Sequence, residues 1–309
     1  MLNIEGFQAF FESDLRHSLQ PLEDYRIKRV KHYKKFRNLS FVLLLLLFLL
    51  FFTSNKVVIA FGILLFVFAL GLAYESLVNT NSTLRKEYKN KVLPKMLGFV
   101  FSDFEYIPRQ KISKSVFQKS LLFPREINTV NGEDFMRFCI DDVELMFCES
   151  EVFGYSPRSK MFSGIFISAT FNKSFKSKTF IFPEKSTSFF RKLKFKALGS
   201  SFSVKLEDPD FEREFIVLSD DQVESRYILT TSLMQRILEY KRKLNAEVAF
   251  SFVSNRLYCS IPNSKNLFEP PIFESFLDIG FIKQNIEPVL FYTSVVKDLN
   301  LNLRIWSKE

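Results

Sequence analysis

The sequence predicts an α+β protein, in which a two-helix transmembrane hairpin is followed by one mixed α+β cytoplasmic domain. Two uncharged apolar runs, 39–53 and 57–74, are separated only by the short polar turn Ser54-Asn55-Lys56. Later in the chain, short segments with strand-like alternation are divided by turn residues. Among them, 231–244 carries the apolar stripe of an amphipathic helix.

The two apolar runs are long enough for two membrane spans. As one helix, 39–74 would be about 54 Å long, whereas the hydrocarbon core is about 30 Å thick. A buried hairpin in a soluble core is the alternative, but neither run shows a polar face. A cleaved signal peptide fits badly, because the first run begins behind acidic residues and no small-residue cleavage site follows it. We therefore predict a cytoplasmic helical segment (1–38), two transmembrane helices (39–54 and 57–77), a juxtamembrane helix (78–98) and the α+β domain (99–309).

Charge placement predicts the orientation of the hairpin. Seven Lys or Arg and no acid lie within 26–37, and further basic residues follow the second run, whereas the connecting turn offers Lys56 alone. Because positive residues stay on the cytoplasmic side, both termini should be cytoplasmic and the turn extracytoplasmic. This places the protein in the cytoplasmic (inner) membrane as a multi-pass protein.

Turn and periodicity signals predict the remaining elements. Residues 3–37 read as helical, with an interruption near Pro21, and Asn131-Gly132 and Ser254-Asn255 read as turns. If Asp141-Asp142 is a two-residue hairpin turn, Met136 faces Phe147 and one face of the hairpin is wholly apolar. Strands are expected near 101–108, 136–140, 143–148, 162–171, 178–182, 214–218, 247–253 and 256–261, and helices near 113–121, 186–193 and 231–244.

The three cysteines do not suggest redox chemistry. In the predicted hairpin, Cys139 lies opposite Glu144, and Cys148 lies two pairs further along, too far away for a disulfide. Cys259 has no partner at a suitable spacing. We expect all three to be small core or surface residues.

The segment 206–227 raises the question of an acidic site, since it holds eight carboxylates in a chain of net charge +9. Asp208 before Pro209 is typical of a helix N-cap, and Ser219-Asp220-Asp221-Gln222 matches a capping box. A metal or catalytic site is the alternative, but Asp220 and Asp221 are adjacent and no EF-hand glycine pattern occurs. The pattern favours a structural role for these acids.

The sequence contains few of the residues and motifs that other kinds of catalysis require. The only histidines are His17 and His32, before the first apolar run, so the domain lacks a histidine for a triad or a zinc site. No GxSxG, GxxxxGK[ST] or GxGxxG motif occurs. We expect no enzyme activity, no cofactor, no metal site and no catalytic residue.

Several motifs, in order, carry a family resemblance: "YIPRQKISKSVFQKSLLF", "NGEDF", "FSGIFISATFNKSF", the block 206–238, "AFSFVSNRLYCSI" and "LFEPPIF". Together they resemble the bacterial family DUF3137, whose members are sometimes mislabelled galanin. The resemblance implies a membrane-anchored cytoplasmic domain of no established activity, and a LemA-type membrane protein as a partner. Ser225 and Thr231 depart from the usual alanine and proline. The family motif positions are Asp208, Phe211, Phe215, Asp220, Asp221, Glu224, Arg226 and Tyr227.

A basic stretch, 171–196, interleaves lysines and arginines with phenylalanines. One interpretation is an edge strand, whose lysines prevent pairing with another chain, together with an exposed helix. The other is a surface that contacts anionic lipid headgroups. Nucleic-acid binding fits less well, because no RNP-like or zinc motif is present. The expected lipid contacts are Lys173, Lys176, Arg191, Lys192, Lys194 and Lys196.

These observations favour a membrane-anchored cytoplasmic binding or scaffold module. The alternative is a carboxylate-based hydrolase or transferase acting at the membrane surface. Such an enzyme would need a polar cleft lined by Asp or Glu.

Overall fold

The computed structural model describes residues 4–50, 56–123, 126–155, 160–170, 176–184, 202–263 and 267–301. The chain divides into two compact units. Unit 1 comprises 1–100 with 268–286, and unit 2 comprises 101–267 with 287–309. Residues 268–286, which the sequence grouped with the α+β domain, thus cluster with the N-terminal helices.

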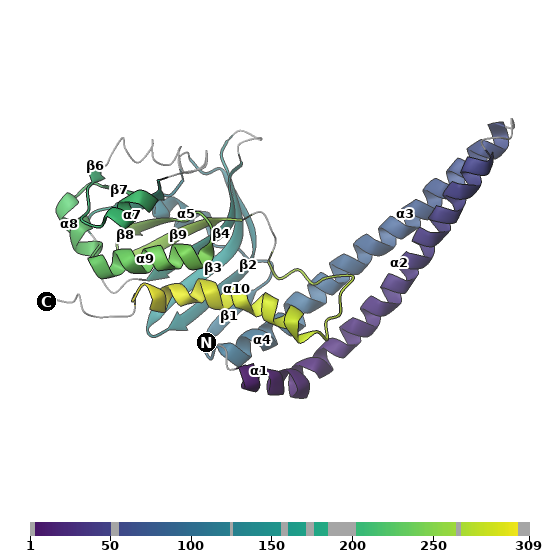
Figure 1. The fold of residues 1–309 in the computed structure, drawn as a ribbon, viewed down its shortest axis with the longest axis horizontal. Helices are drawn as coiled ribbons and strands as arrows, with labels where there is room; N and C mark the ends of the chain where they lie inside the picture. The colour runs from purple at the N-terminus through teal and green to yellow at the C-terminus, as the bar shows by residue number, and fades with distance from the viewer. Residues whose placement is uncertain are drawn as a thin grey trace. The chain divides into compact units, whose positions relative to one another are not determined.

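Unit 1 is built on two long helices that lie side by side (Figure 1). The first part of the chain forms α1 (Ile4–Phe10), a π-helical turn (Phe11–Leu15) and α2 (Arg16–Leu50). The second part forms α3 (Lys56–Glu87), a π-helical turn (Tyr88–Val92) and α4 (Leu93–Val100).

The predicted interruption near Pro21 is wrong. Pro21 lies inside α2, which continues without a break. Proline removes one helical hydrogen bond, but Leu19 and Leu22 are buried on either side of it, and such packing can offset the loss.

The apolar side chains of α2 and α3 are mostly uncovered. Between Leu39 and Val78, the large apolar residues that face outward are 39% to 77% exposed. In the described part of the chain, one helical stretch, Lys56–Val100, is long and apolar enough to cross a membrane. The end of the first apolar run, 51–53, lies outside the described residues.

A buried ion pair of α2 holds the segment 272–276 within unit 1. Glu23 and Arg26 are 4% and 8% exposed and join through two contacts of 2.9 and 2.6 Å. The Glu23 carboxylate also accepts from the Ser275 hydroxyl and the Phe276 N–H, both at 3.0 Å. Arg26 donates to the carbonyl of Ile272 at 3.1 Å. Every group of the pair is thereby satisfied by a partner within unit 1.

Unit 2 is a mixed α+β fold around one nine-stranded antiparallel sheet (Figure 1). The strands follow the order β1-β2-β3-β4-β9-β8-β5-β7-β6. The strands are β1 (Phe104–Ile107), β2 (Thr129–Ile140), β3 (Val143–Phe153), β4 (Lys160–Thr170), β5 (Thr179–Pro183), β6 (Phe202–Val204), β7 (Phe215–Ser219), β8 (Ala249–Val253) and β9 (Arg256–Pro262). The helices are α5 (Lys114–Ser120), α7 (Pro209–Glu214), α8 (Gln222–Ile228), α9 (Thr231–Leu244) and α10 (Ile279–Asp298), whose first turns belong to unit 1.

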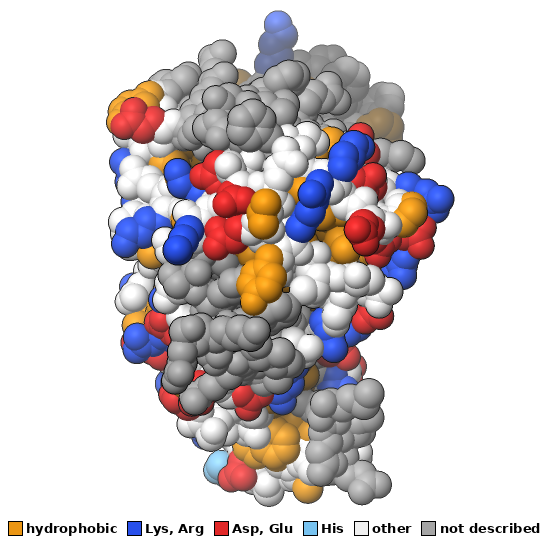
Figure 2. Space-filling model, turned by 90° about the vertical axis from the view of Figure 1, so that its left-hand side faces the viewer, with side chains coloured by type: hydrophobic (Ala, Val, Ile, Leu, Met, Phe, Trp, Pro, Cys, Tyr) orange, Lys and Arg blue, Asp and Glu red, His pale blue; other side chains and the backbone are white. Residues whose placement is uncertain are grey.

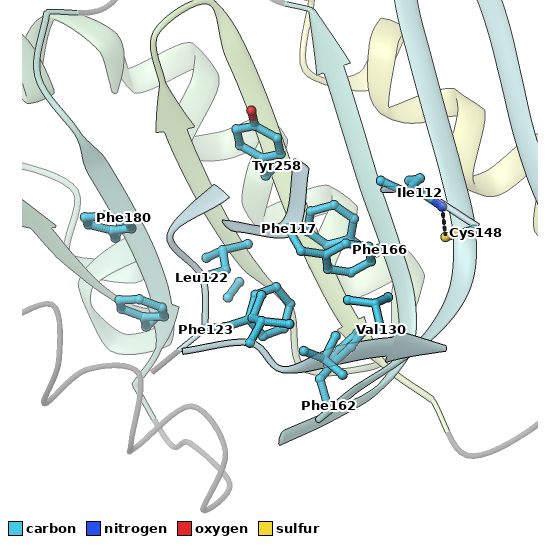
Figure 3. Close-up of a cluster of buried hydrophobic side chains, with 14 of the residues drawn as sticks. Ile112, Phe117, Leu122, Phe123, Val130, Cys148, Phe162, Phe166, Phe180 and Tyr258 are labelled. Carbon is cyan, nitrogen blue, oxygen red and sulfur yellow. Dashed lines mark hydrogen bonds between the residues drawn. The ribbon is translucent and has the colours of Figure 1, made fainter. Parts of the chain in front are cut away.

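Helices cover both faces of this sheet. On one face, Tyr292 of α10 contacts Phe147 of β3, and Tyr240 of α9 contacts Phe250 of β8. On the other face, Phe117 of α5 stacks on Phe166 of β4, with 4.1 Å between the ring centroids. Figure 3 shows this second core, in which side chains from α5, the loop after it and several strands meet.

The β2–β3 hairpin confirms the predicted register. Met136 pairs with Phe147, Cys139 with Glu144 and Ile140 with Val143. Asp141 and Asp142 both have positive φ, as a two-residue hairpin turn requires. The Ser254-Asn255 turn between β8 and β9 is also confirmed, whereas the expected helix 186–193 lies outside the described residues.

The expected turn at Asn131-Gly132 is wrong, because both residues lie inside β2, which begins at Thr129. The close approach of the β3 backbone explains why glycine occupies position 132. A Cβ on Gly132 would collide with the Glu149 carbonyl oxygen of β3. The glycine therefore permits close approach of two strands rather than a reversal of the chain.

The thiols lie where the sequence predicted. Cys148 and Cys259 are fully buried and Cys139 is exposed, and all three are free. Burial raises the pKa of Cys148 to about 11, and it raises the pKa of Cys259 well above its usual value. The buried thiols therefore stay protonated and unreactive at neutral pH.

Candidate functional site

The acid-rich segment 206–227 places its carboxylates at helix starts and backbone turns. Asp208 is the N-cap of α7, where its side chain accepts from the N–H groups of Asp210 and Phe211 at 3.0 and 3.1 Å. Pro209 follows at the first helical position. Phe211 and Phe215 pack together at the two ends of the helix, with 5.0 Å between ring centroids.

The start of α8 differs from the predicted capping box. The N-cap is Asp221, whose side chain accepts from the N–H groups of Val223 and Glu224. Ser219 is buried instead at the end of β7, where its hydroxyl donates to the Lys178 carbonyl oxygen at 3.0 Å. The cap therefore lies two residues further along the chain than the sequence pattern suggested.

Other carboxylates of the segment hold a neighbouring chain segment. Asp220 accepts from the Lys178 N–H at 2.7 Å, and Glu224 accepts from the N–H groups of Lys176 and Ser177. Arg226 donates to the Lys205 carbonyl oxygen, and Tyr227 is half exposed. On the side of the structure where α8 lies, basic and acidic side chains are interspersed rather than gathered into patches (Figure 2). The described contacts of these acids are those of a structural segment.

The predicted lipid-contact residues lie largely outside the described structure. Only Lys176 is described, and its side chain is exposed. The other five positions, Lys173, Arg191, Lys192, Lys194 and Lys196, fall within 171–175 and 185–201. A lipid contact through this stretch stays a prediction.

A polar groove of about 410 Å³ lies across three strands of unit 2. Pairing places Glu133 of β2 directly opposite Glu149 of β3, and Asn131 opposite Glu151. The lining residues are Asn131, Gly132, Glu133, Glu149, Ser150, Glu151, Ser163, Gly164, Ile165 and Asn263.

Three carboxylates converge where Glu133 and Glu149 line this groove. Oxygen atoms of Glu133, Asp134 and Glu149 all lie within 4.8 Å of one another. Asp134 is fully buried at a bulge in β2 and accepts from the Tyr106 hydroxyl at 2.7 Å, while Glu149 accepts from the Leu267 N–H. Like charges directly opposite each other destabilise a sheet. Glu133, Asp134 and Glu149 are consequently the described residues that could hold a divalent cation through oxygen ligands.

Two glycines let the strands that line the groove approach each other closely. Gly132 lies against the Glu149 carbonyl, and a Cβ on Gly164 would collide with the Ile261 carbonyl oxygen. The Gly164 φ of +155° also disfavours a side chain. Any larger residue at either position would push adjacent strands apart.

Sequence reasoning missed this groove. Its acids are separated in the chain and come together only through the register of β2 on β3. The motif "NGED" contained the signal, but Asn131-Gly132 was interpreted as a turn. An acidic pair after a glycine inside a long strand was the clue.

These features define an α+β protein with a nine-stranded antiparallel sheet and a long apolar helix. Residues 160–301 match the family described as "Protein of unknown function (DUF3137)". Over these residues the chain is similar to the DUF3137 family, which supports the resemblance that its motifs indicated. Among curated proteins, none matches the chain.

One solved structure shows a distant likeness. The crystal structure of the mycobacterial trehalose monomycolate transport factor A, TtfA, matches at 7% identity with a TM-score of 0.34. The match covers 63% of this chain and 88% of that chain. Identity and TM-score are both too low for the likeness to bear on function.

Proposed function

We propose that this protein is a membrane-anchored binding or scaffold module, held in the cytoplasmic membrane by a hairpin of α2 and α3. The observation that carries the proposal is the uncovered apolar surface of both helices. Phe41 and Phe48 of α2 and Phe61 and Phe68 of α3 are each more than 60% exposed. Contiguous apolar surface of this size is unfavourable in water and is stable in lipid.

The lack of a polar face distinguishes this hairpin from one in a soluble protein. A helical pair buried in a soluble core would expose a polar face, whereas 39–49 and 57–74 carry no charged residue. The basic residues that precede the first apolar run and follow the second favour a cytoplasmic location for unit 2.

The groove of β2, β3 and β4 supports a binding role for unit 2, because it is a concave polar surface. The acids of 206–227 are instead occupied at helix starts and backbone turns. A partner that docks in the groove would meet carboxylate and amide groups, so basic or hydrogen-bonding groups suit it best.

Membrane extraction tests the anchor. The full chain should stay with the membrane fraction in alkaline carbonate and leave it only in detergent. Release by carbonate would refute the hairpin. Copurification from detergent extract, compared between the unaltered chain and Asn131→Lys, then tests the groove, because Asn131 is an exposed lining residue and a lysine there would repel basic groups. A partner lost only with Asn131→Lys, at unchanged thermal midpoint, supports binding there.

The second candidate is a carboxylate-based hydrolase or transferase at the membrane surface. The convergence of Glu133, Asp134 and Glu149 beside the groove favours it. Calorimetric titration with Mg²⁺ or Ca²⁺ distinguishes the two functions. Binding that is abolished in Glu133→Gln but retained in Glu151→Gln would favour the enzyme, and absence of binding in the unaltered chain would favour the scaffold.

A further inference from the structure

Four lysines of α2 form a stripe on one exposed helix face, here called the lysine stripe: Lys28, Lys31, Lys34 and Lys35. Spacings of three, four and seven residues place side chains on the same side of a helix. The opposite side of these turns is covered, since Arg26, Val30 and Ser40 are buried. The lysine stripe therefore faces away from the rest of unit 1.

The charges of the lysine stripe are not neutralised within the described residues. None of the four lysines makes an ion pair or hydrogen bond with another described residue, and no acid occurs in the sequence from 25 to 74. Asp24, the nearest acid along the chain, accepts from Gln20 instead. Like charges three and four residues apart destabilise a helix, so an anion lying along this face would stabilise it.

The same face of α2 becomes apolar within a few residues. Val42, Leu46 and Leu49 continue the spacing of Lys35 and are 51%, 48% and 62% exposed. With a rise of about 1.5 Å per residue, Lys35 lies about 6 Å before Leu39, where the apolar surface begins. The headgroup layer on each side of a bilayer is about 5–8 Å thick. Lys34 and Lys35 thus fall at headgroup depth when the apolar surface is in hydrocarbon.

We propose that the lysine stripe binds the phosphate groups of anionic phospholipids in the leaflet where α2 enters the membrane. The inference rests on the proposed membrane anchor, but it concerns a different property, lipid selectivity. Free phosphate or nucleic acid shares the anionic chemistry. The transition from lysine to apolar residues on one face favours lipid, because only a lipid presents phosphate directly above hydrocarbon.

Depth predicts an order among the lysines. Lys28 lies about 16 Å from Leu39, beyond the Debye length of about 10 Å at 0.1 M salt. Lys34 and Lys35 should therefore contribute most, Lys31 less and Lys28 least. A lysine close to an anionic surface contributes about fivefold in affinity.

The test uses the full chain reconstituted in phosphatidylcholine vesicles that contain either spin-labelled phosphatidylglycerol or spin-labelled phosphatidylcholine. The ratio of protein-restricted anionic to zwitterionic lipid should exceed one, and should fall at least fivefold, or to one, in K34Q/K35Q. It should fall less in K28Q. Salt at 1 M should lower it, and inorganic phosphate should lower it no more than sodium chloride of equal ionic strength.

The matched control is K114Q/K119Q, which removes two exposed lysines from α5 of unit 2 and should leave the ratio unchanged. Carbonate extraction of each variant separates the two proposals. If K34Q/K35Q stays in the membrane with its anionic selectivity intact, the lysine stripe is not the lipid site and the anchor stands. The same conclusion follows if selectivity depends only on Arg191, Lys192, Lys194 and Lys196. Release of the unaltered chain by carbonate overturns both proposals.

Discussion

Adjacent acids in this chain have different structural roles. Asp208 and Asp221 cap helices through two backbone N–H groups each, whereas Glu207 is exposed and has no hydrogen-bond partner among the described residues. The motif predicted the Asp208 cap because proline follows it. It misplaced the second cap because Ser219 and Asp221 are both favourable N-cap residues, and burial of Ser219 beside Thr179 of β5 decided between them.

Loss of a cap should lower stability without removing chemistry. We predict that Asp208→Ala and Asp221→Ala each lower the free energy of unfolding by about 0.5–2 kcal/mol. Glu207→Ala is the control and should change it by less than about 0.5 kcal/mol. Denaturant unfolding in mild detergent measures all three. An equal loss in Glu207→Ala would show that net charge, not capping, is responsible.

Glu23 is the acid whose ionisation should affect folding most clearly. Burial alone would raise its pKa, but hydrogen bonds from Arg26, the Phe276 N–H and Ser275, with the Arg26 charge, outweigh burial and lower the pKa. We predict that Glu23→Gln lowers stability by about 3–5 kcal/mol, because Arg26 then stays buried without a counter-charge.

The lowered pKa fixes the sign of the pH dependence. The ionised group stabilises the fold above its unfolded pKa, near 4.5, and this contribution is lost as pH falls through the lower folded value. The stability gap between the unaltered chain and Glu23→Gln should therefore be constant near pH 7 and shrink below about pH 4.5. Asp24→Asn, at an exposed neighbour, should show little gap at any pH. A gap that grows on acidification contradicts the assignment.

At the scale of elements, the sequence pattern predicted those helices and hairpins that depend on residues close together in the chain. The β2–β3 register followed from alternation, and α9 was predicted over 231–244, where Leu233, Met234, Ile237 and Leu238 are buried. α10 was missed because Pro288 lies inside it and its pattern lacks a clear polar face. The groove was missed because strand pairing, not sequence proximity, brings its acids together.

The C-terminus of α9 offers a test of local backbone conformation. Asn245 follows the helix with φ of 48°, in the left-handed region, and its N–H bonds to Lys241 and Arg242. Glycine enters this region without a Cβ penalty, so Asn245→Gly should raise stability by up to about 1 kcal/mol. Asn245→Ala should lower it by about 1 kcal/mol. Thermal midpoints that move in the same direction for both variants would contradict a left-handed cap.

At the scale of the whole molecule, the sequence predicts the class of protein more directly than its activity. Apolar runs and charge asymmetry are properties of the chain itself, so they could be recognised before folding is considered. A binding surface depends on which residues long-range pairing brings together. Glu133 and Glu149 illustrate the difference, since neither stands out in the sequence and strand pairing brings them together in the lining of the groove.

The same charge asymmetry predicts the orientation of the chain in the membrane. The segment 26–37 carries seven basic residues and the turn between the apolar runs carries Lys56 alone, so the turn should lie outside and both termini inside. A reporter enzyme active only outside the cytoplasmic membrane should be silent when fused after Glu309.

A membrane-impermeant thiol reagent should label Lys56→Cys in intact cells, in a chain whose Cys139 is replaced by Ser. Its label should exceed that of Lys114→Cys in the same background. Activity of the Glu309 fusion, or labelling of Lys114→Cys alone, would reverse the orientation.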